Sequence, residues 1–400
     1  MSSATTTATD SGAASHQVLQ AVTDLLPVLR ERAQETEDLR RIPDESIKSL
    51  QATGFFKLLQ PQRYGGLEAS PVDLYRGVRM IASACGSTGW VSSVLGVHPW
   101  QLGIFDDRAQ QEVWGEDPAT LVSSSYAPMG RATPVDGGFT FNGRWSFSSG
   151  CDHAQWIFLG GLVMGPEGTP IDFRTFLLPR SDYEIEDVWD TIGLRGTGSN
   201  DIIVKDAFVP EYRTLSFIET GRCAGPGQEQ NTAPLYRLPF ASVFSCSIAV
   251  PVVGMATGAY DSYVSWTKER VRASTGTKAA DDSFNQIRIA ESAAQLDGAV
   301  LQIERNIEEE LAYAERGEKI PMSLRVRVRR DQVNATAAGI AAVDRLFESA
   351  GGRALRAGTP IQRFWRDAHA GRVHAINDPE KVRVMYGQFE LGLKVQDAWL

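Results

Sequence analysis

The hydrophobic pattern of the chain changes twice along its length, and this order restricts the fold more than any single motif. Up to about Gly115, apolar residues recur at helical intervals, as in AVTDLLPVLRERAQETEDLRRIPDESIKSLQATGFF. From Thr120 to about Thr214, β-rich runs such as FTFNGRWSF and AQWIFLGGLVM alternate with glycine and proline. Beyond Leu235, helical periodicity returns in stretches long enough for bundle helices. The pattern predicts helical, β and helical regions in that order.

These changes define the expected domains. We expect a disordered tail over residues 1–16, an N-terminal helical domain over 17–119, a β domain over 120–234 and a C-terminal helical bundle over 235–400. The glycine pair in VDGGFTFNG favours antiparallel hairpins. The fold class is therefore α+β, mainly α, with a central antiparallel β domain.

Local signals place several helix ends. Pro43 with Asp44 restarts a helix that Gly54 stops, and a further helix runs from about Pro71 to Ala84. Glycine is the residue that most readily ends a helix in a left-handed conformation. Gly317 and Gly351 are therefore expected to end two long helices of the C-terminal bundle.

Composition excludes several classes of function. The net charge of -9 argues against nucleic acid as a partner, and we expect the basic run RVRVRR at Arg325 to Arg330 to form a solvated or ion-paired helix face. No apolar stretch approaches the roughly 20 residues that cross a membrane, and the start MSSATTTATDSGAASHQ does not resemble a secretory signal. These features favour the cytoplasm and no membrane contact.

Common cofactor and metal motifs are absent from the sequence. No GxGxxG follows a strand, no GxxxxGK[ST] loop occurs, and neither GxSxG nor HExxH is found. Four cysteines, Cys85, Cys151, Cys223 and Cys246, are too widely separated for a zinc or redox motif and are expected to be reduced thiols. We therefore expect no metal site.

Four segments instead resemble the acyl-CoA dehydrogenase superfamily, in the order in which that superfamily carries them. They are FNGRWSFSSGCDHAQWIF, GLRGTGSNDIIVKDAFVP, ERVRAS and FESAGGRALRAGTPIQRFWRDAHAGRVHAINDP. The resemblance spans roughly residues 17 to 395. It implies the acyl-CoA dehydrogenase-like fold, a flavin beside the β-domain turn within the first segment, and a homotetramer.

The departures from the dehydrogenases indicate a branch of the superfamily. Where many dehydrogenases carry Tyr-Glu-Gly, with glutamate as the base, this chain has His374, Ala375 and Ile376. Alanine cannot accept the α-proton of a thioester. Five segments together resemble most the oxygenase components of two-component flavin hydroxylases, in particular those acting on the phenolic secosteroid of bacterial steroid breakdown. They are CGSTGWVSSVLGVHPW, GEDPATLVSSSYAPMG, FSSGCDHA, GLRGTGSN and IQRFWRDAHAGRVHAINDPE.

That resemblance implies a reaction. Reduced FMN or FAD would come from a separate NAD(P)H-dependent flavin reductase, and dioxygen would be the co-substrate. An aromatic substrate would be hydroxylated ortho to its phenol, giving a catechol through a C4a-hydroperoxyflavin. The segment ERVRAS lacks the Phe-Gly that usually follows the arginine in FAD-binding relatives, which favours FMN without deciding the question.

The resemblance also implies flavin-binding residues. Trp90, Ser124, Ser125 and Tyr126 match positions that line the flavin, and Phe147, Ser148 and Ser149 lie where a strand ends at its N5 edge; Arg270 would bind the flavin phosphate, with Arg272 as the alternative. Ser148 would also act in catalysis by hydrogen bonding to the oxygenated flavin. Each residue also has a purely structural alternative. Trp90 would be a core residue, Ser148 and Ser149 would only stabilise a turn, and Arg270 would form a surface ion pair.

His98 and His374 are the expected catalytic histidines, and His374 would also contact the flavin. A phenol has a pKa of roughly 10, so a positioned base is needed to form the phenolate at neutral pH, and histidine suits that role. Either histidine qualifies, and either is alternatively a structural histidine. His369 is expected outside the site, and Asp367 is expected to hold Arg363 or Arg366.

Three other functions stay open at this point. One is a hydroxylase of a polyketide-derived or other polycyclic phenol. Another is an acyl-CoA dehydrogenase that holds FAD tightly. The third is a non-catalytic flavin-storage or scaffold protein.

Overall fold

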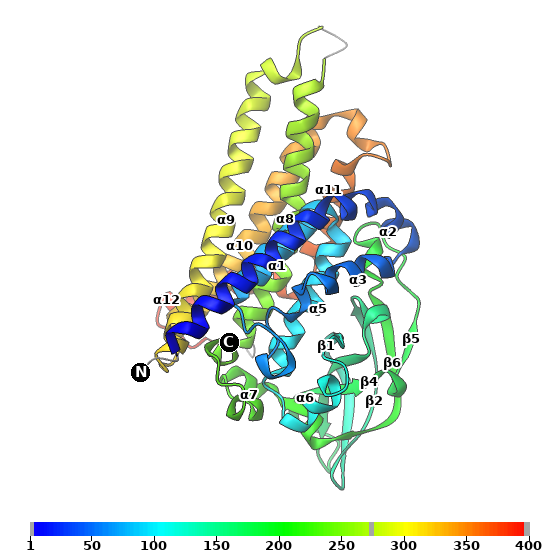
Figure 1. Cartoon of the computed structure of the whole chain (residues 1–400), viewed down its shortest axis with the longest axis vertical. Coiled ribbons are helices and arrows are strands. Elements are labelled where there is room, and N and C mark those ends of the chain that lie inside the picture. Colours follow the sequence, from blue (N-terminus) through cyan, green and yellow to red (C-terminus); the bar gives the residue numbers. More distant parts are fainter. Residues whose placement is uncertain (1–3, 272–275, 396–400) are drawn as a thin grey trace.

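Helices form both ends of the chain and strands form its middle, as the sequence predicts. The computed structural model describes residues 4–271 and 276–395. The helices are α1 Ala4–Glu31, α2 Ala33–Leu39, α3 Asp44–Ala52, α4 Pro71–Ala84, α5 Gly86–Leu102, α6 Asp107–Trp114, α7 Phe217–Gly221, α8 Phe240–Glu269, α9 Ser283–Glu315, α10 Met322–Ala350, α11 Pro360–Arg372 and α12 Pro379–Glu390. The strands are β1 Val122–Val135, β2 Gly138–Ser148, β3 Trp156–Met164, β4 Pro170–Pro179, β5 Glu184–Glu186, β6 Asn200–Pro210 and β7 Thr214–Ser216. The long helices α8, α9 and α10 stand beside one another, and the sheet lies at one end of the molecule (Figure 1).

The predicted helix ends are confirmed where a local signal exists. The Ser70 hydroxyl accepts from the Val72 amide and Pro71 occupies the first turn of α4, so this helix begins where the sequence places it. Gly54, Gly317 and Gly351 all have a positive φ directly after or near a helix end. The left-handed conformation that glycine tolerates ends these helices.

Helix α1 begins at Ala4 and so extends through residues 4–16 of the segment for which the sequence predicts a disordered tail. Ser15 is buried, and its hydroxyl donates to the Gly12 carbonyl at 3.2 Å. Ala13 and Ala14 have high helix propensity, and they extend the amphipathic stretch that follows instead of interrupting it. Residues 1–3 lie outside the described part of the chain.

The seven strands form one sheet in the order β5-β6-β2-β1-β3-β4-β7. The predicted hairpin is confirmed, since Val135 pairs with Gly138 across Asp136 and Gly137. The antiparallel expectation is wrong for one pair, because β1 and β3 run parallel. After β2 the chain crosses the end of β1 through residues 149–155 and starts β3 on the other side, which sets β3 in the direction of β1.

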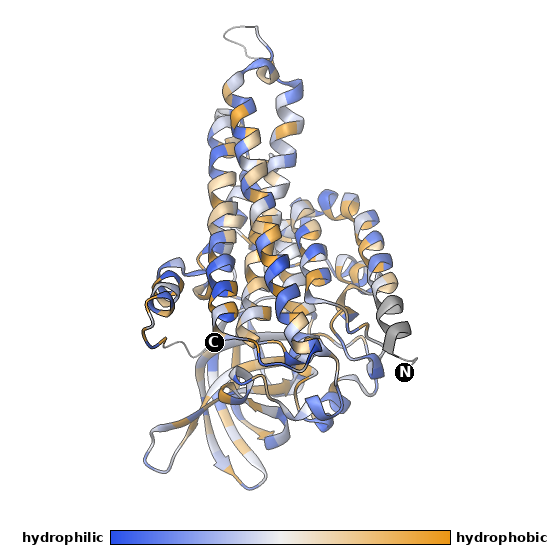
Figure 2. Cartoon of the chain, turned by 90° about the vertical axis from the view of Figure 1, so that its left-hand side faces the viewer, coloured by the Kyte–Doolittle hydropathy of each residue, from blue (hydrophilic) through white to orange (hydrophobic). Residues whose placement is uncertain are grey.

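Helix α5 lies between the sheet and the bundle and is buried along its whole length. It shares one hydrophobic core with α4, α8 and the strand residues Val122, Tyr126 and Phe158. Hydrophobic and hydrophilic residues alternate along the bundle helices (Figure 2). Helix α8 is long and apolar enough to cross a membrane by composition, but 94% of its most apolar window is buried inside the protein, as expected of a core helix.

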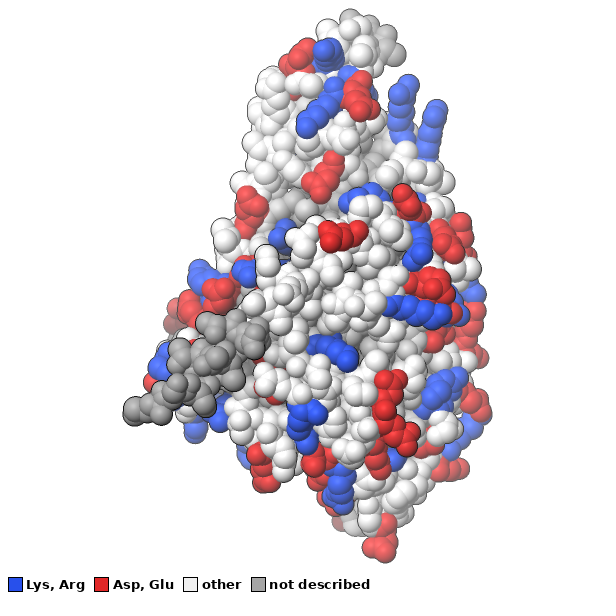
Figure 3. Space-filling model, in the orientation of Figure 1, with Lys and Arg blue, Asp and Glu red and all other residues white. Residues whose placement is uncertain are grey.

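Charged side chains of both signs are interspersed on the face shown in Figure 3. In the basic run, Arg327 pairs with Glu309 and Arg330 pairs with Asp331, which confirms the ion-paired reading for these two residues. Arg329 differs, because it is buried in α10 and donates to the Ile376 carbonyl at 3.3 Å. All four cysteines are free thiols.

Candidate active site

Strands β1 and β2 separate at the place where the sequence puts the flavin. Their pairing ends at Arg131 and Asn142. Beyond these residues, the pairing of β1 with β3 and the pairing of β2 with β6 both shift register. The Ser125 hydroxyl bridges the opened strands by donating to the Ser146 carbonyl at 2.8 Å. Such irregular strand ends are common beside active sites because they re-aim side chains.

Phe147 and Ser148 occupy the end of β2 in contrasting ways. Phe147 has a φ of 69° and is 69% exposed, although it is a large apolar residue. A strained and exposed aromatic residue is expected where a ligand covers it. The Ser148 hydroxyl is fully buried and has no hydrogen-bond partner among the described residues.

Trp90 and Ser149 contact each other across the boundary between α5 and β2. The Trp90 indole donates to the Ser149 hydroxyl at 3.1 Å, and both residues are buried. The Trp90 ring lies 5.9 Å from the His374 ring. Trp90, Ser149 and His374 are thus one group, as the resemblance implies.

His98 lies on the same helix, eight residues after Trp90 and therefore about 12 Å further along it. Its Nδ1 is 2.5 Å from the Val122 carbonyl, which can only accept, so Nδ1 carries the proton. Nε2 is buried without a partner among the described residues, and burial lowers the His98 pKa to about 4. His98 is neutral at pH 7 and offers one free lone pair.

His374 has the opposite arrangement. Its Nδ1 accepts from the Ile376 amide at 3.2 Å and caps the short helix that follows. Burial lowers its pKa to about 4 as well, so the neutral ring carries its proton on Nε2. His374 can donate a hydrogen bond where His98 can accept one.

Ser124 and Tyr126 lie on β1 on the side of His98. Tyr126 donates to Gln101 and packs edge-on against Phe240 and Phe244, with ring centroids 5.5 and 5.0 Å away. The rings of His98 and Phe158 are 5.6 Å apart. The rings of Tyr126 and Phe158 therefore both pack edge-on against the imidazole of His98.

Arg270 is not brought to this group within one chain. It follows the last residue of α8, where its guanidinium lies 4.3 Å from the Trp266 ring and donates to the Ala350 carbonyl. Gly371 approaches both Trp90 and Val252, and Arg270 lies 18 residues beyond Val252, or about 27 Å along α8. Arg272, the alternative, lies outside the described residues.

Two expectations about the last helices have different outcomes. His369 contacts Asp344 and the Trp365 carbonyl, so it lies outside the group, as predicted. The expectation for Asp367 is wrong, because Glu37 binds Arg363 and Arg366 instead. Asp367 is buried and accepts from the Leu194 amide at 2.6 Å.

Two residues that the sequence analysis did not single out join the group. The Ser199 hydroxyl lies 2.7 Å from that of Ser149 and 2.6 Å from that of Thr197. Both residues belong to the quoted segment GLRGTGSN, whose two hydroxyl residues flank Gly198. That spacing was the available signal, but their contact with Ser149 depends on the tertiary fold.

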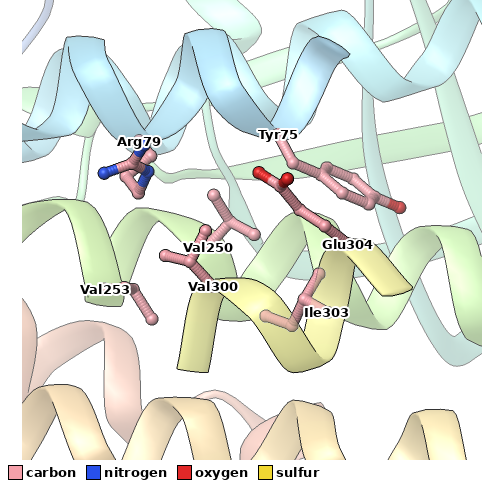
Figure 4. A pocket seen from close by; sticks show the side chains of 7 residues that line it. All are labelled: Tyr75, Arg79, Val250, Val253, Val300, Ile303 and Glu304. Carbon is pink, nitrogen blue, oxygen red and sulfur yellow. The ribbon is translucent and has the colours of Figure 1, made fainter. Parts of the chain in front are cut away.

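Neither of two surface pockets contains the predicted histidines. One lies between α4, α8 and α9 and is lined by Tyr75, Val250 and Glu304, among others (Figure 4). The other lies beside Arg270 and is lined by Trp266, Arg353 and Thr359, among others. Among the described residues, no group of three or more His, Cys, Asp or Glu side chains has the arrangement of a metal site.

Comparison with known proteins decides the family. Residues 16–118 and 246–379 match the models of the N-terminal and C-terminal domains of acyl-CoA dehydrogenases. The chain is 57% identical over 381 residues to the flavin-dependent monooxygenase oxygenase subunit HsaA of Rhodococcus jostii, covering 95% of this chain and 100% of that protein. The chain belongs to the flavin-dependent monooxygenases of this superfamily.

Further relatives of this monooxygenase extend the comparison. The FADH(2)-dependent resorcinol hydroxylase oxygenase component of Rhizobium sp. is 34% identical, covering 93% of both chains. The crystal structure of 3-HSA hydroxylase from Rhodococcus sp. RHA1 superposes with a TM-score of 0.94 at 56% identity, covering 96% of this chain and 99% of that one. The predicted fold and enzyme class are thereby confirmed.

Proposed function

We propose that this monooxygenase hydroxylates a phenolic secosteroid ortho to its hydroxyl group, giving a catechol. The full-length likeness to HsaA and to 3-HSA hydroxylase carries the choice of substrate. The observation that carries the chemistry is the buried, free Nε2 of His98 among aromatic rings.

The residues present fit a flavin at the end of β2. Phe147 is exposed, and the buried Ser148 hydroxyl has no hydrogen-bond partner among the described residues. On the side of the protein interior, the hydrogen-bonded pair of Trp90 and Ser149 would border the flavin. Reduced FMN or FAD, when bound there, would supply the oxygen-transfer chemistry with dioxygen. The relatives are oxygenase components, so a separate NAD(P)H-dependent flavin reductase is the expected partner.

The chain's own residues would divide the remaining work. His98 accepts the phenolic proton at Nε2, and a phenolate beside it would raise the pKa of the imidazolium by charge attraction. His374 donates from Nε2 toward the flavin side, and Ser148 offers a hydroxyl there. The buried surroundings of His98 exclude water from its imidazole, whereas His374 is half-buried.

The test is oxygen transfer to a panel of phenols with chemically reduced FMN in place of the reductase. We expect a catechol carrying one atom of labelled dioxygen, with the highest kcat/KM for the secosteroid phenol. A higher kcat/KM for a polyketide-derived phenol would overturn the substrate. The absence of hydroxylated product from every phenol would overturn the reaction.

The position of Arg270 bears on how copies of the chain assemble. We propose a cytoplasmic homotetramer in which Arg270 serves a flavin held by another copy, because it lies about 27 Å along α8 from the region of Trp90. Light scattering would measure the mass of the assembly. A monomer in solution, with unchanged flavin affinity in Arg270→Ala, would contradict this part.

A further inference from the structure

A chain of hydrogen bonds runs inward from Trp90 through three hydroxyl groups to one backbone carbonyl. The indole donates to Ser149, and the hydroxyls of Ser149, Ser199 and Thr197 follow at 2.7 and 2.6 Å. Thr197 then donates to the Leu194 carbonyl at 2.9 Å. Ser149, Ser199 and Thr197 are at most 6% exposed, so water does not compete for these hydroxyls.

The Leu194 carbonyl sets the direction of the whole chain. A carbonyl cannot donate, so the Thr197 proton must point to it, since two oxygen atoms 2.9 Å apart without a proton between them repel each other. Thr197 must then accept from Ser199, and Ser199 must accept from Ser149. Each hydroxyl has a single proton, so the Ser149 proton is committed to Ser199.

Ser149 can therefore only accept a further hydrogen bond. It already accepts from Trp90 and keeps one lone pair. The N5 atom of a flavin carries a hydrogen in the reduced form and a bare lone pair in the oxidised form. We propose that this hydroxyl chain makes the site selective for flavin protonated at N5, with Ser199 and Thr197 as positioning residues. The inference rests on the proposed flavin site at Ser149.

The carbonyl at the end of the chain is itself held in place. Leu194 has a φ of 52°, a left-handed conformation that is uncommon for leucine. Asp367 accepts a hydrogen bond from the Leu194 amide, and the Trp189 indole donates to the Leu194 carbonyl at 2.8 Å. Asp367 thus holds Leu194 through the preceding peptide group, and the Trp189 indole holds the carbonyl on which the direction of the hydroxyl chain depends.

The experiment measures the dissociation constants of oxidised FMN and of chemically reduced FMN under anaerobic conditions, by fluorescence and absorbance titration of the full-length protein. Wild type should bind reduced FMN more tightly. Ser199→Ala frees the Ser149 proton to donate to N5 of the oxidised flavin. We expect the preference for reduced FMN to fall about tenfold, the effect of one hydrogen bond, mainly through tighter binding of oxidised FMN.

Variants at the next link make the test independent of any one substitution. Thr197→Val should give the same shift as Ser199→Ala, and Thr197→Ser, which keeps the hydroxyl, should restore the wild-type preference. Ser92→Ala is the matched control, because Ser92 is a fully buried α5 serine without a hydrogen-bond partner among the described residues. It should leave the preference unchanged.

The outcomes separate this inference from the proposed function. Equal weakening of both flavin forms in Ser199→Ala and Thr197→Val would show a structural role only and overturn the inference. A wild-type protein that forms catechol but binds both flavin forms equally would also overturn it, leaving the hydroxylase intact. Failure of the wild type to hydroxylate any phenol, with the redox preference and its loss in the variants still measured, would overturn the proposed function alone.

Discussion

Neutral imidazole has one proton, and the nitrogen that carries it decides whether His98 or His374 can act as the base. His98 donates a hydrogen bond from Nδ1–H to the Val122 carbonyl, so its Nε2 can accept. His374 accepts a hydrogen bond at Nδ1 and carries its proton on Nε2. Replacing each with glutamine should therefore have different effects. Without His98, the phenolate must come from solution, so hydroxylation should fall roughly 100-fold at pH 7 and recover as the pH approaches the phenol pKa.

His374→Gln should lower the yield of hydroxylated product per flavin oxidised without adding that pH dependence, because the amide of glutamine places its donor differently from imidazole Nε2 and the proposed base, His98, is unchanged. Single-turnover product formation between pH 6 and pH 10 would measure both effects. If His374→Gln showed the rise with pH and His98→Gln did not, the two roles would have to be exchanged.

For single residues, the sequence could predict which side chains belong to the candidate site, but not which of them donate and which accept hydrogen bonds. The resemblance named Trp90, Ser149 and His374 as candidates, and the structure places these three side chains next to one another. The partners of Ser199 and Asp367 depend on a loop that packs against α5 and α11, and no local pattern records that packing.

Among the helices, α4, α5 and α8 cross at glycines that leave no room for a side chain. A Cβ at Gly89 would lie 2.3 Å from Ala82, and one at Gly254 would lie 2.6 Å from the Arg79 carbonyl. Backbone atoms cannot move aside as a flexible side chain can. We therefore expect Gly254→Ala to reduce the free energy of unfolding by about 1–3 kcal/mol through overpacking.

Gly387 in α12 is the matched control, since a Cβ there would meet no atom within 4 Å. Gly387→Ala should stabilise the protein by up to about 1 kcal/mol through helix propensity. Urea unfolding of both variants would measure the difference. Equal effects of the two substitutions would contradict a tight crossing of these helices.

Elements with their own start and stop residues were predictable, and elements defined by the path of the chain were not. Ser70 and Pro71 fix the start of α4 locally. The parallel pairing of β1 with β3 has no such signal, because it depends on which side of β1 the segment 149–155 crosses. The separation of β1 and β2 at the candidate site likewise has no local signal in the sequence.

For the whole molecule, buried titratable groups set the pH range of stability. Burial lowers the pKa of His98, His153 and His374 to about 4, so the unfolded chain binds more protons than the folded one between pH 4 and about 6.5. Burial raises the pKa of Asp367 to about 6 and of Glu310 to about 8, and these two groups act in the opposite direction. Taken by themselves, these three histidines and two carboxyls make the free energy of unfolding rise with pH up to about 6.5, by roughly 1 kcal/mol per pH unit.

Above that pH only Glu310 among these five groups still titrates. Its carboxyl is fully buried, accepts from the Ser242 hydroxyl at 2.7 Å and leaves Oε2 without a hydrogen-bond partner among the described residues.

The folded state keeps the proton of Glu310 up to about pH 8, whereas the unfolded state has lost it, so the free energy of unfolding falls as the pH rises from 6.5 to 8. Glu310→Gln keeps the shape, removes the titration and should gain roughly 1–2 kcal/mol over wild type at pH 8 with little difference at pH 6.5. Denaturant unfolding at both pH values would measure this, with Glu308→Gln, an exposed neighbour on α9, as the control. A difference between Glu310→Gln and wild type that was the same at both pH values would mean that this carboxyl does not titrate in the folded protein.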